Sequence, residues 1–189
     1  MPDQNMGRKD PPPDVDDALI QNAMRGESAA LEAIYNTYAR RVYRYFLSRV
    51  ADHADAEDLT AQTFMSVIEA LPRYQHRDQF TAWLFQIAHS KAMDFFRRNS
   101  SRVRKEAGTK GMVFDETLER VVQNQTIESL RLLIQTLDEE EHELLRLRFV
   151  ADLTYPEIAE LLGRKEDAVR KSVNRILERL HTQMEARHA

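Results

Sequence analysis

Apolar residues recur at helical spacing along most of the chain, and the pattern is clearest between residues 154 and 180. Thr154 and Glu157 have the spacing of a capping box, in which each side chain satisfies a backbone N–H at the start of a helix. A short apolar run follows and ends at Gly163, a residue suited to the left-handed conformation beyond a helix C-terminus. The segment therefore predicts a short helix that ends in a tight turn.

A second helix is predicted after this turn. Its apolar positions share one face and predict a buried stripe made of Val169, Val173, Ile176, Leu177 and Leu180. The other face carries Arg170, Lys171, Asn174 and Arg175. A scaffold helix, a glycine turn and a second helix with an outward basic face form the helix-turn-helix plan, whose second helix fits the major groove of DNA. An ordinary helical hairpin with a solvated charged face is the alternative.

Helical periodicity also dominates the rest of the chain, so the predicted fold class is all-α. Only 5 of the 189 residues are Gly and 6 are Pro, which favours long helices over β architecture. Ahead of the helix-turn-helix, helices are expected at residues 14–25, 28–50, 55–71, 80–98, 125–136 and 138–150.

These helices are expected to form two small domains. We expect a disordered tail at residues 1–17, a four-helix bundle at 18–98, a flexible linker at 99–125 and a helix-turn-helix domain at 126–189. The tail contains Pro-Pro-Pro, which a helix cannot hold, and the linker segment lacks a sustained apolar period.

The distribution of charge changes this picture more than the total does. The net charge is −4, yet residues 97–105 carry five basic side chains and no acidic one, and the second helix of the hairpin is also basic. Acidic residues gather at 52–58 and 138–143. An acidic chain with two basic patches predicts weak DNA binding alone and a need for a partner.

Several classes of protein are disfavoured by the composition. The chain has no cysteine, so neither disulfides nor thiolate metal sites are expected, and no apolar run is long enough for a membrane span. We therefore expect a cytoplasmic protein without membrane insertion. The six histidines lack metal-ligand spacing, and no phosphate-binding loop or nucleophile motif is present, so no metal, cofactor or enzymatic activity is expected.

Three segments together resemble an extracytoplasmic-function (ECF) sigma factor, a small bacterial sigma subunit that keeps only conserved regions 2 and 4. They are DAEDLTAQTF at 55–64, FTAWLFQIAHSKAMDFFRR at 80–98, and residues 137–180, which include the helix-turn-helix. The resemblance implies that region 2 docks on the clamp helices of core RNA polymerase and reads and melts the −10 promoter element. It implies that region 4 docks on the polymerase flap and reads the −35 element.

The candidate polymerase contact is an acidic helix face. Asp55, Asp58 and Gln62 fall at i, i+3 and i+7, with Glu57 beside them, and this face would suit a basic partner helix. Acidic residues are also favoured at any helix N-terminus by the helix dipole. Family members usually carry Glu where Gln62 stands, so the face lacks one charge, and phosphorylation by a kinase at nearby Thr60 or Thr63 would restore it.

The candidate DNA contacts follow from the same resemblance. For the −10 element they are Tyr74, His76, Arg77, Trp83, Ser90, Lys91, Arg97 and Arg98. For the −35 element they are Lys165, Arg170, Lys171, Asn174 and Arg175. The loop at 73–79 with Ser90 and Lys91 would form a pocket for a flipped base, on which Tyr74 and His76 would stack.

The side-chain types suggest individual roles within this set. Arg77 would hold a phosphate of the DNA backbone, as would Arg97, Arg98, Arg102 and Arg104 in the basic stretch. Trp83 is as well suited to the core as to wedging into DNA. Ser90 replaces a frequent Asn of the family, and Lys171 with Ser172 reverses a frequent order, which puts the promoter sequence in doubt.

The expected partners are core RNA polymerase, promoter DNA and an anti-sigma factor. An autonomous helix-turn-helix regulator, with an N-terminal bundle that senses a ligand or dimerises, remains the alternative. In the free protein, the two domains are expected to pack together and to hide both basic patches.

Overall fold

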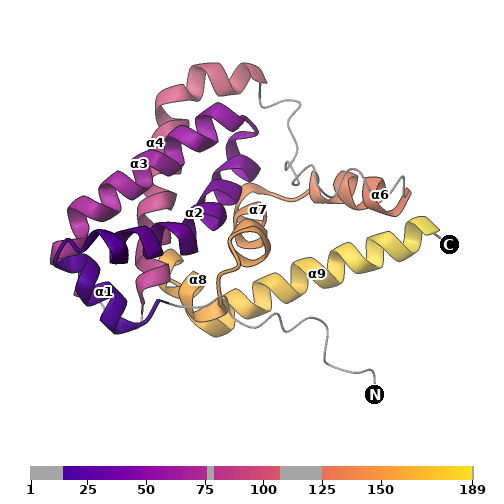
Figure 1. The fold of residues 1–189 in the computed structure, drawn as a ribbon. Helices are drawn as coiled ribbons and strands as arrows, with labels where there is room; N and C mark the ends of the chain where they lie inside the picture. Colours follow the sequence, from indigo (N-terminus) through magenta and orange to yellow (C-terminus); the bar gives the residue numbers. More distant parts are fainter. Residues whose placement is uncertain (1–14, 76–78, 107–124, 189) are drawn as a thin grey trace.

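The computed structural model describes residues 15–75, 79–106 and 125–188, and the regular secondary structure in these ranges is entirely helical. The helices form two groups that touch one another (Figure 1). We call α1 to α4 the N-terminal unit and α6 to α9 the C-terminal unit. The all-α class and the division into two helical parts, predicted from the sequence, are confirmed.

The N-terminal unit packs four α-helices around a ring-rich core. The helices are α1 (Asp17–Met24), α2 (Ser28–Val50), α3 (His53–Ala70) and α4 (Phe80–Glu106), with a short 3-10 turn η1 (Leu71–Arg73) after α3. Side chains that are almost wholly buried include Tyr38, Tyr45, Phe46, Phe80 and Phe85. The Tyr38 hydroxyl lies 2.8 Å from the Thr81 hydroxyl, so this buried polar group is hydrogen-bonded between α2 and α4.

Local sequence explains where these helices begin and end. The Asp16 carboxylate accepts a hydrogen bond from the backbone N–H of Leu19 at 2.7 Å, and Asp52 caps α3 through the N–H of Asp55 at 3.0 Å. Between α2 and α3 the chain turns at Ala51, which adopts a left-handed conformation with φ of 54°.

The C-terminal unit is smaller and has an aliphatic core. It contains α6 (Gln125–Ile134), α7 (Glu139–Leu145), a π-helical segment η2 (Arg146–Val150), α8 (Tyr155–Leu162) and α9 (Glu166–His188). Its most deeply buried side chains include Leu144, Leu147, Leu153, Ile158, Val169 and Val173. The long helix α9 extends beyond this core and runs alongside α6 (Figure 1).

The predicted capping box at Thr154 is confirmed, and a second capping box begins α7. At the start of α8, Thr154 and Glu157 bond reciprocally to each other's backbone N–H groups, and Asp138 and Glu141 do the same for α7. Gly163 ends α8 with φ of 61°, as its place in the sequence predicts.

The two units meet through α2 and α4 on one side and η2 and α8 on the other. Arg41 of α2 is buried, and its guanidinium donates hydrogen bonds to the backbone carbonyls of Ala151 at 2.9 Å and Asp152 at 3.1 Å. These carbonyls belong to the turn between η2 and α8, where Asp152 has φ of 53°. The expected packing of the two domains is therefore present.

Some details differ from the sequence-based expectations. Helix α4 continues to Glu106, so the segment predicted as a linker from residue 99 begins as helix. Leu177, predicted to be buried, is 40% exposed, and Ile68 of α3 is 50% exposed. Each lies at the edge of an apolar stripe, where the neighbouring elements decide burial and periodicity alone does not.

Candidate functional site

The basic face of α9 is open to solvent. Lys165 precedes the helix and Arg170, Lys171, Asn174 and Arg175 lie on it, and all five are exposed. Buried Val169, Val173 and Ile176 fix the opposite face of α9 against the core. The expected orientation of this helix is confirmed, and the packing of the units does not cover the basic face, contrary to expectation.

Arg170 is held by two neighbours in this arrangement. It forms an ion pair with Glu166 one turn earlier on α9, and its guanidinium carbon lies 5.4 Å from the centroid of the Tyr155 ring. Arg148 lies over the same ring at 4.8 Å and donates a hydrogen bond to the carbonyl of Leu153 at 2.8 Å. Tyr155 thus supports Arg170, a cation that the sequence predicts to contact DNA.

The predicted polymerase-binding residues lie on α3. Glu57 and Asp58 are exposed, and Asp55 and Gln62 are partly exposed. The Gln62 amide donates a hydrogen bond of 2.6 Å to the Asp58 carboxylate, which joins the residues of this face as their spacing predicts. Among the described residues, α3 packs against α2, α4 and η1, and its buried side chains, such as Ala56, Leu59 and Val67, do not belong to this face.

The two threonines predicted as kinase sites do not share this exposure. Thr63 is 0% exposed and its hydroxyl donates a hydrogen bond of 2.8 Å to the carbonyl of Leu59. Thr60 is 6% exposed and its hydroxyl bonds in the same way to Ala56 at 2.7 Å. A kinase cannot reach either hydroxyl unless α3 unfolds locally, so the structure argues against phosphorylation as the source of the missing charge.

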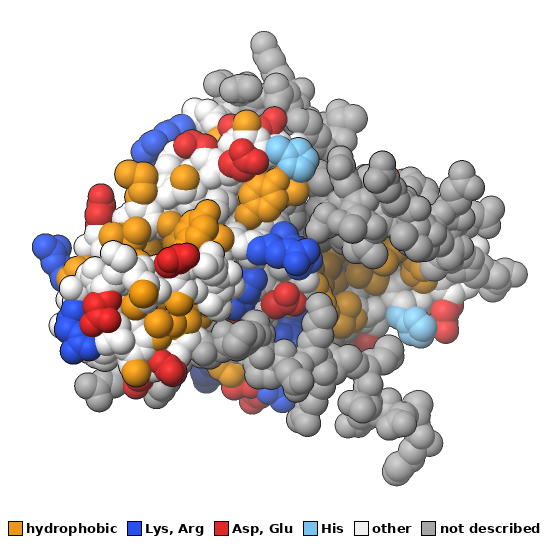
Figure 2. Space-filling view, in the orientation of Figure 1, with side chains coloured by type: hydrophobic (Ala, Val, Ile, Leu, Met, Phe, Trp, Pro, Cys, Tyr) orange, Lys and Arg blue, Asp and Glu red, His pale blue; other side chains and the backbone are white. Residues whose placement is uncertain are grey.

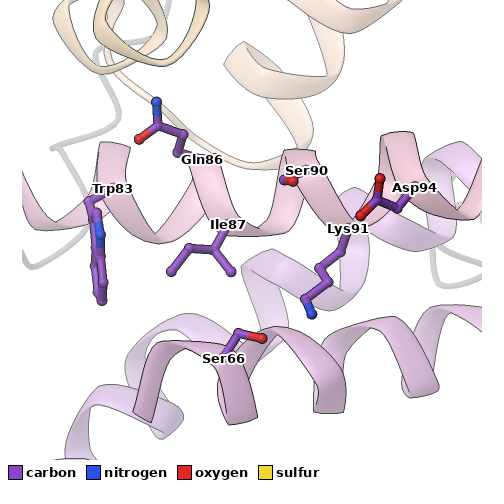
Figure 3. A pocket seen from close by; sticks show the side chains of 7 residues that line it. All are labelled: Ser66, Trp83, Gln86, Ile87, Ser90, Lys91 and Asp94. Carbon is purple, nitrogen blue, oxygen red and sulfur yellow. The ribbon is translucent and has the colours of Figure 1, made fainter. Parts of the chain in front are cut away.

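A hollow of about 260 Å³ lies between α3 and α4. It is lined by Ser66, Trp83, Gln86, Ile87, Ser90, Lys91 and Asp94 (Figure 3). Trp83, Ile87 and Lys91 point toward α3, while Ser90 lies on the upper side of α4 with Gln86 (Figure 3). The hollow therefore contains three of the predicted −10 contacts, Trp83, Ser90 and Lys91.

The remaining predicted −10 contacts are Tyr74, His76 and Arg77 and, further along the chain, Arg97 and Arg98. Tyr74 is only 8% exposed, and its ring packs against Phe80 and Trp83 with centroids at 5.5 and 4.8 Å. In this structure Tyr74 is a core residue, and stacking on a base would require the ring to leave that packing. His76 and Arg77 lie outside the described residues.

The structure describes only part of the basic stretch at residues 97–105, which follows the residues that line the hollow. Arg97 and Arg98 are exposed, and Arg97 forms an ion pair with Asp94 at 2.9 Å. Arg102 and Arg104 continue α4, but their side chains lie outside the described part of the structure.

The view in Figure 2 shows acidic and basic side chains interspersed over this face of the molecule rather than one large area of a single sign. Among the described residues, no three His, Asp or Glu side chains are grouped as metal ligands. In the described ranges, the model likewise contains no helix with both the length and the apolar character that a membrane span needs.

The sequence did not single out two features of this geometry. The role of Tyr155 beside Arg170 depends on the way α8 crosses α9, and an aromatic residue at the start of a helix gave no signal for it. The buried carboxylate of Glu143 lay within an acidic segment that predicted only a solvated, capped helix.

Comparison with known proteins identifies the class. The family model for sigma-70 region 2 matches residues 34–102, and the model for sigma-70 region 4 matches residues 127–180. The chain belongs to the RNA polymerase sigma factors, and more particularly to the ECF sigma factors, with sigma-70 regions 2 and 4. The region 2 match falls on the N-terminal unit and the region 4 match on the C-terminal unit.

Individual relatives agree with this assignment. The chain is 36% identical to the ECF RNA polymerase sigma factor BldN of Streptomyces coelicolor, over 80% of this chain and 59% of BldN. It is 28% identical to the ECF RNA polymerase sigma factor SigM of Bacillus subtilis, over 79% of this chain and 92% of SigM. The solved structure of CnrH in complex with the cytosolic domain of CnrY superposes with a TM-score of 0.61 at 25% identity, covering 92% of this chain and 99% of CnrH.

Proposed function

We propose that this ECF sigma factor directs core RNA polymerase to specific promoters in transcription initiation. The observation that carries the proposal is the presence of two separate exposed surfaces on the two units. One is the acidic and polar face of α3, and the other is the basic face of α9. A sigma factor is a specificity subunit and not an enzyme, and it acts with its polymerase, so we place the protein in the cytoplasm.

The α3 face is proposed to bind the polymerase clamp helices. Asp55, Glu57 and Asp58 supply negative charge for a basic partner, and Gln62 supplies hydrogen-bonding capacity through its amide. Because Gln62 is neutral, docking should be weaker than with Glu at this position.

The α9 face is proposed to enter the major groove of the −35 element. Arg and Lys side chains bind guanine edges or phosphates, and Asn binds adenine edges. The hollow between α3 and α4, together with exposed Arg97 and Arg98, is proposed to contact the opened −10 element. Lys91 would supply positive charge inside the hollow and Trp83 an aromatic face.

An anti-sigma factor is a further proposed partner. CnrH, which shares the fold and 25% of its sequence with this chain, was solved with the cytosolic domain of another protein bound. This supports the expectation that a second protein controls access to the polymerase.

Binding titrations with core RNA polymerase test the polymerase contact. Asp58→Lys should abolish binding, and Gln62→Glu should raise affinity severalfold, because a partly desolvated charge pair across an interface contributes more than about 1 kcal/mol. Glu32→Lys makes the same charge change as Asp58→Lys at an exposed position of α2 and is the control. Equal affinity of the wild type, Asp58→Lys and Gln62→Glu would remove α3 from the interface.

Promoter-specific transcription tests the function as a whole. The holoenzyme should initiate at a promoter that requires its −35 element, and the free protein should bind the same duplex weakly and in a salt-sensitive manner. If the free protein instead bound one duplex tightly at physiological salt and did not co-elute with core polymerase, the autonomous-regulator alternative would hold.

A further inference from the structure

A carboxylate of the C-terminal unit is buried against the N-terminal unit. Glu143 on α7 is 6% exposed. Its carboxylate accepts a hydrogen bond of 2.7 Å from the Tyr45 hydroxyl and lies 3.0 Å from Nδ1 of His89. It also forms ion pairs with Arg49 of α2 and, at 3.5 Å, with Arg146 of its own unit. Three of the four partners come from the other unit.

The hydrogen bonds and the positive charge around Glu143 compensate for the burial of its carboxylate. Burial raises the pKa of Glu143, but the hydrogen bond with His89 and the charge of Arg49 outweigh it and hold the pKa below its ordinary value. Burial and the neighbouring Glu143 raise the pKa of Tyr45, so the phenol stays protonated and donates. Glu143 is therefore ionised in this contact near neutral pH, and loss of a partner leaves an uncompensated buried charge.

The contact of Arg41 with the η2–α8 turn lies at the same junction. Arg41 binds the two carbonyls with its guanidinium, and that guanidinium also lies over the rings of Tyr38 and Phe85 at 5.3 and 5.5 Å. Thus charged and hydroxyl groups of the N-terminal unit bind both α7 and the turn that leads into the helix-turn-helix.

This closed arrangement cannot serve both promoter elements at once. The −10 and −35 elements are about 25 base pairs apart, or roughly 85 Å at about 3.4 Å per base pair of B-DNA. A compact chain of this length has a radius of gyration of about 16 Å. Two units in direct contact therefore cannot reach both elements, so they must separate before the promoter is engaged.

We propose that Glu143 and Arg41 form an intramolecular latch that holds the free sigma factor closed and inhibits its assembly on the promoter. The proposal rests on the proposed function of the two units. Polymerase docking opens the latch, because binding to two distant sites favours the separated units over the closed ones. The hydrogen bonds and ion pairs of the contact suit this role, because charged and hydroxyl groups are compatible with water after the units separate.

The closed state can be measured directly by distance. The chain has no cysteine, so one cysteine placed on exposed Glu32 and one on exposed Glu178 would carry a donor and an acceptor dye for energy transfer. The wild type should show one population with high transfer efficiency. Arg41→Ala with Glu143→Gln should raise the open-to-closed ratio about ten- to a hundredfold, as expected for the loss of charged hydrogen bonds.

Two further variants separate the latch from general destabilisation. Glu140→Gln alters a carboxylate of the same helix whose ion pair with Arg164, at 2.6 Å, stays within the C-terminal unit, so it should leave the ratio unchanged. Tyr45→Phe removes only the hydroxyl that bonds Glu143 and should open the chain partially while keeping the ring in the core. Unchanged transfer in both Tyr45→Phe and the double variant would overturn the latch.

Transcription assays measure whether the closed contact between the units inhibits initiation. At a limiting concentration of sigma factor, the double variant should initiate severalfold more than the wild type, and Glu140→Gln should match the wild type. An opened variant with unchanged initiation would show that the contact is not inhibitory. If instead the wild type failed to support any transcription with core polymerase while transfer still reported closure, the proposed function would fail and the intramolecular contact would stand.

Discussion

The two units bury their cores by different means. In the N-terminal unit, aromatic rings from α2 and α4 interlock, with the Tyr45 and Phe85 centroids 6.0 Å apart and almost perpendicular. In the C-terminal unit the deepest residues are aliphatic, and the helix ends are fixed by capping boxes at Asp138 and Thr154 and by the turn at Gly163. The contrast indicates that long-range packing positions the α3 face of the N-terminal unit, whereas local backbone geometry positions the α9 face of the C-terminal unit.

The largest expected effect is in the ring-rich core. Phe85 is 0% exposed, so Phe85→Ala should lower the free energy of unfolding of the N-terminal unit by about 3–5 kcal/mol. Denaturant unfolding followed by circular dichroism measures it. Tyr35→Ala, at a ring that is 49% exposed, is the control and should cost far less. Similar losses in both variants would mean that the rings do not form the stabilising core.

The next effect addresses the local geometry of the C-terminal unit. Gly163 has φ of 61° and no atom within 4 Å of an added Cβ, so Gly163→Ala should cost about 1–2 kcal/mol through backbone strain alone. It should also weaken −35 binding by the holoenzyme, because the strained turn sets the position of α9.

Gly26→Ala is the matched control for this prediction. Gly26 has φ of 82°, again with no atom within 4 Å, but it lies at the end of α1 in the other unit. It should cause a similar loss of stability without changing −35 recognition in a promoter-binding titration. An equal loss of −35 binding in both variants would contradict the prediction that the turn at Gly163 sets the position of α9.

A smaller effect is expected at Tyr155. Its ring lies under Arg170, and a cation–π contact at an exposed site contributes about 0.5–1 kcal/mol. Tyr155→Leu should therefore weaken binding to the −35 element two- to fivefold, by roughly that energy, while Tyr155→Phe, which keeps the ring, should bind like the wild type. Equal binding by Tyr155→Leu would show that Glu166 and the helix alone position Arg170.

The smallest effect is expected from a change of pH, which acts on the contact between the units through the carboxylate of Glu143. The pKa of Glu143 in the closed state lies below its ordinary value of 4.5, so its ionisation favours closure above that value. This contribution is lost as pH falls through the depressed pKa. Energy transfer between the labelled units should stay constant from neutral pH to about 5 and fall only in stronger acid. The Glu143→Gln variant should lack this step.

Local signals in the sequence predicted the C-terminal unit well. The spacing of Thr154, Glu157 and Gly163 determines caps and a turn over a few residues, and the structure has all three. The exposed basic face of α9 followed from the apolar stripe opposite it. Leu177 was misplaced because it lies at the edge of that stripe.

The N-terminal unit could be predicted only in outline. Its helices follow from periodicity, but the burial of Tyr74 depends on Phe80 and Trp83, and the hollow beside Lys91 depends on how α3 crosses α4. The burial of Glu143 depends on side chains nearly a hundred residues away in the chain. No local pattern encodes a contact of that kind, so the sequence predicted the packing of the two units but not the residues that make it.

The hydrogen bonds and ion pairs between the units also have a thermal consequence. Exposure of apolar surface raises the heat capacity, whereas exposure of polar surface lowers it. Separation of the Glu143 cluster and of Arg41 exposes polar groups along with the flanking apolar side chains, so the two contributions oppose each other. The polar groups therefore reduce the change in heat capacity that exposure of the apolar side chains alone would give.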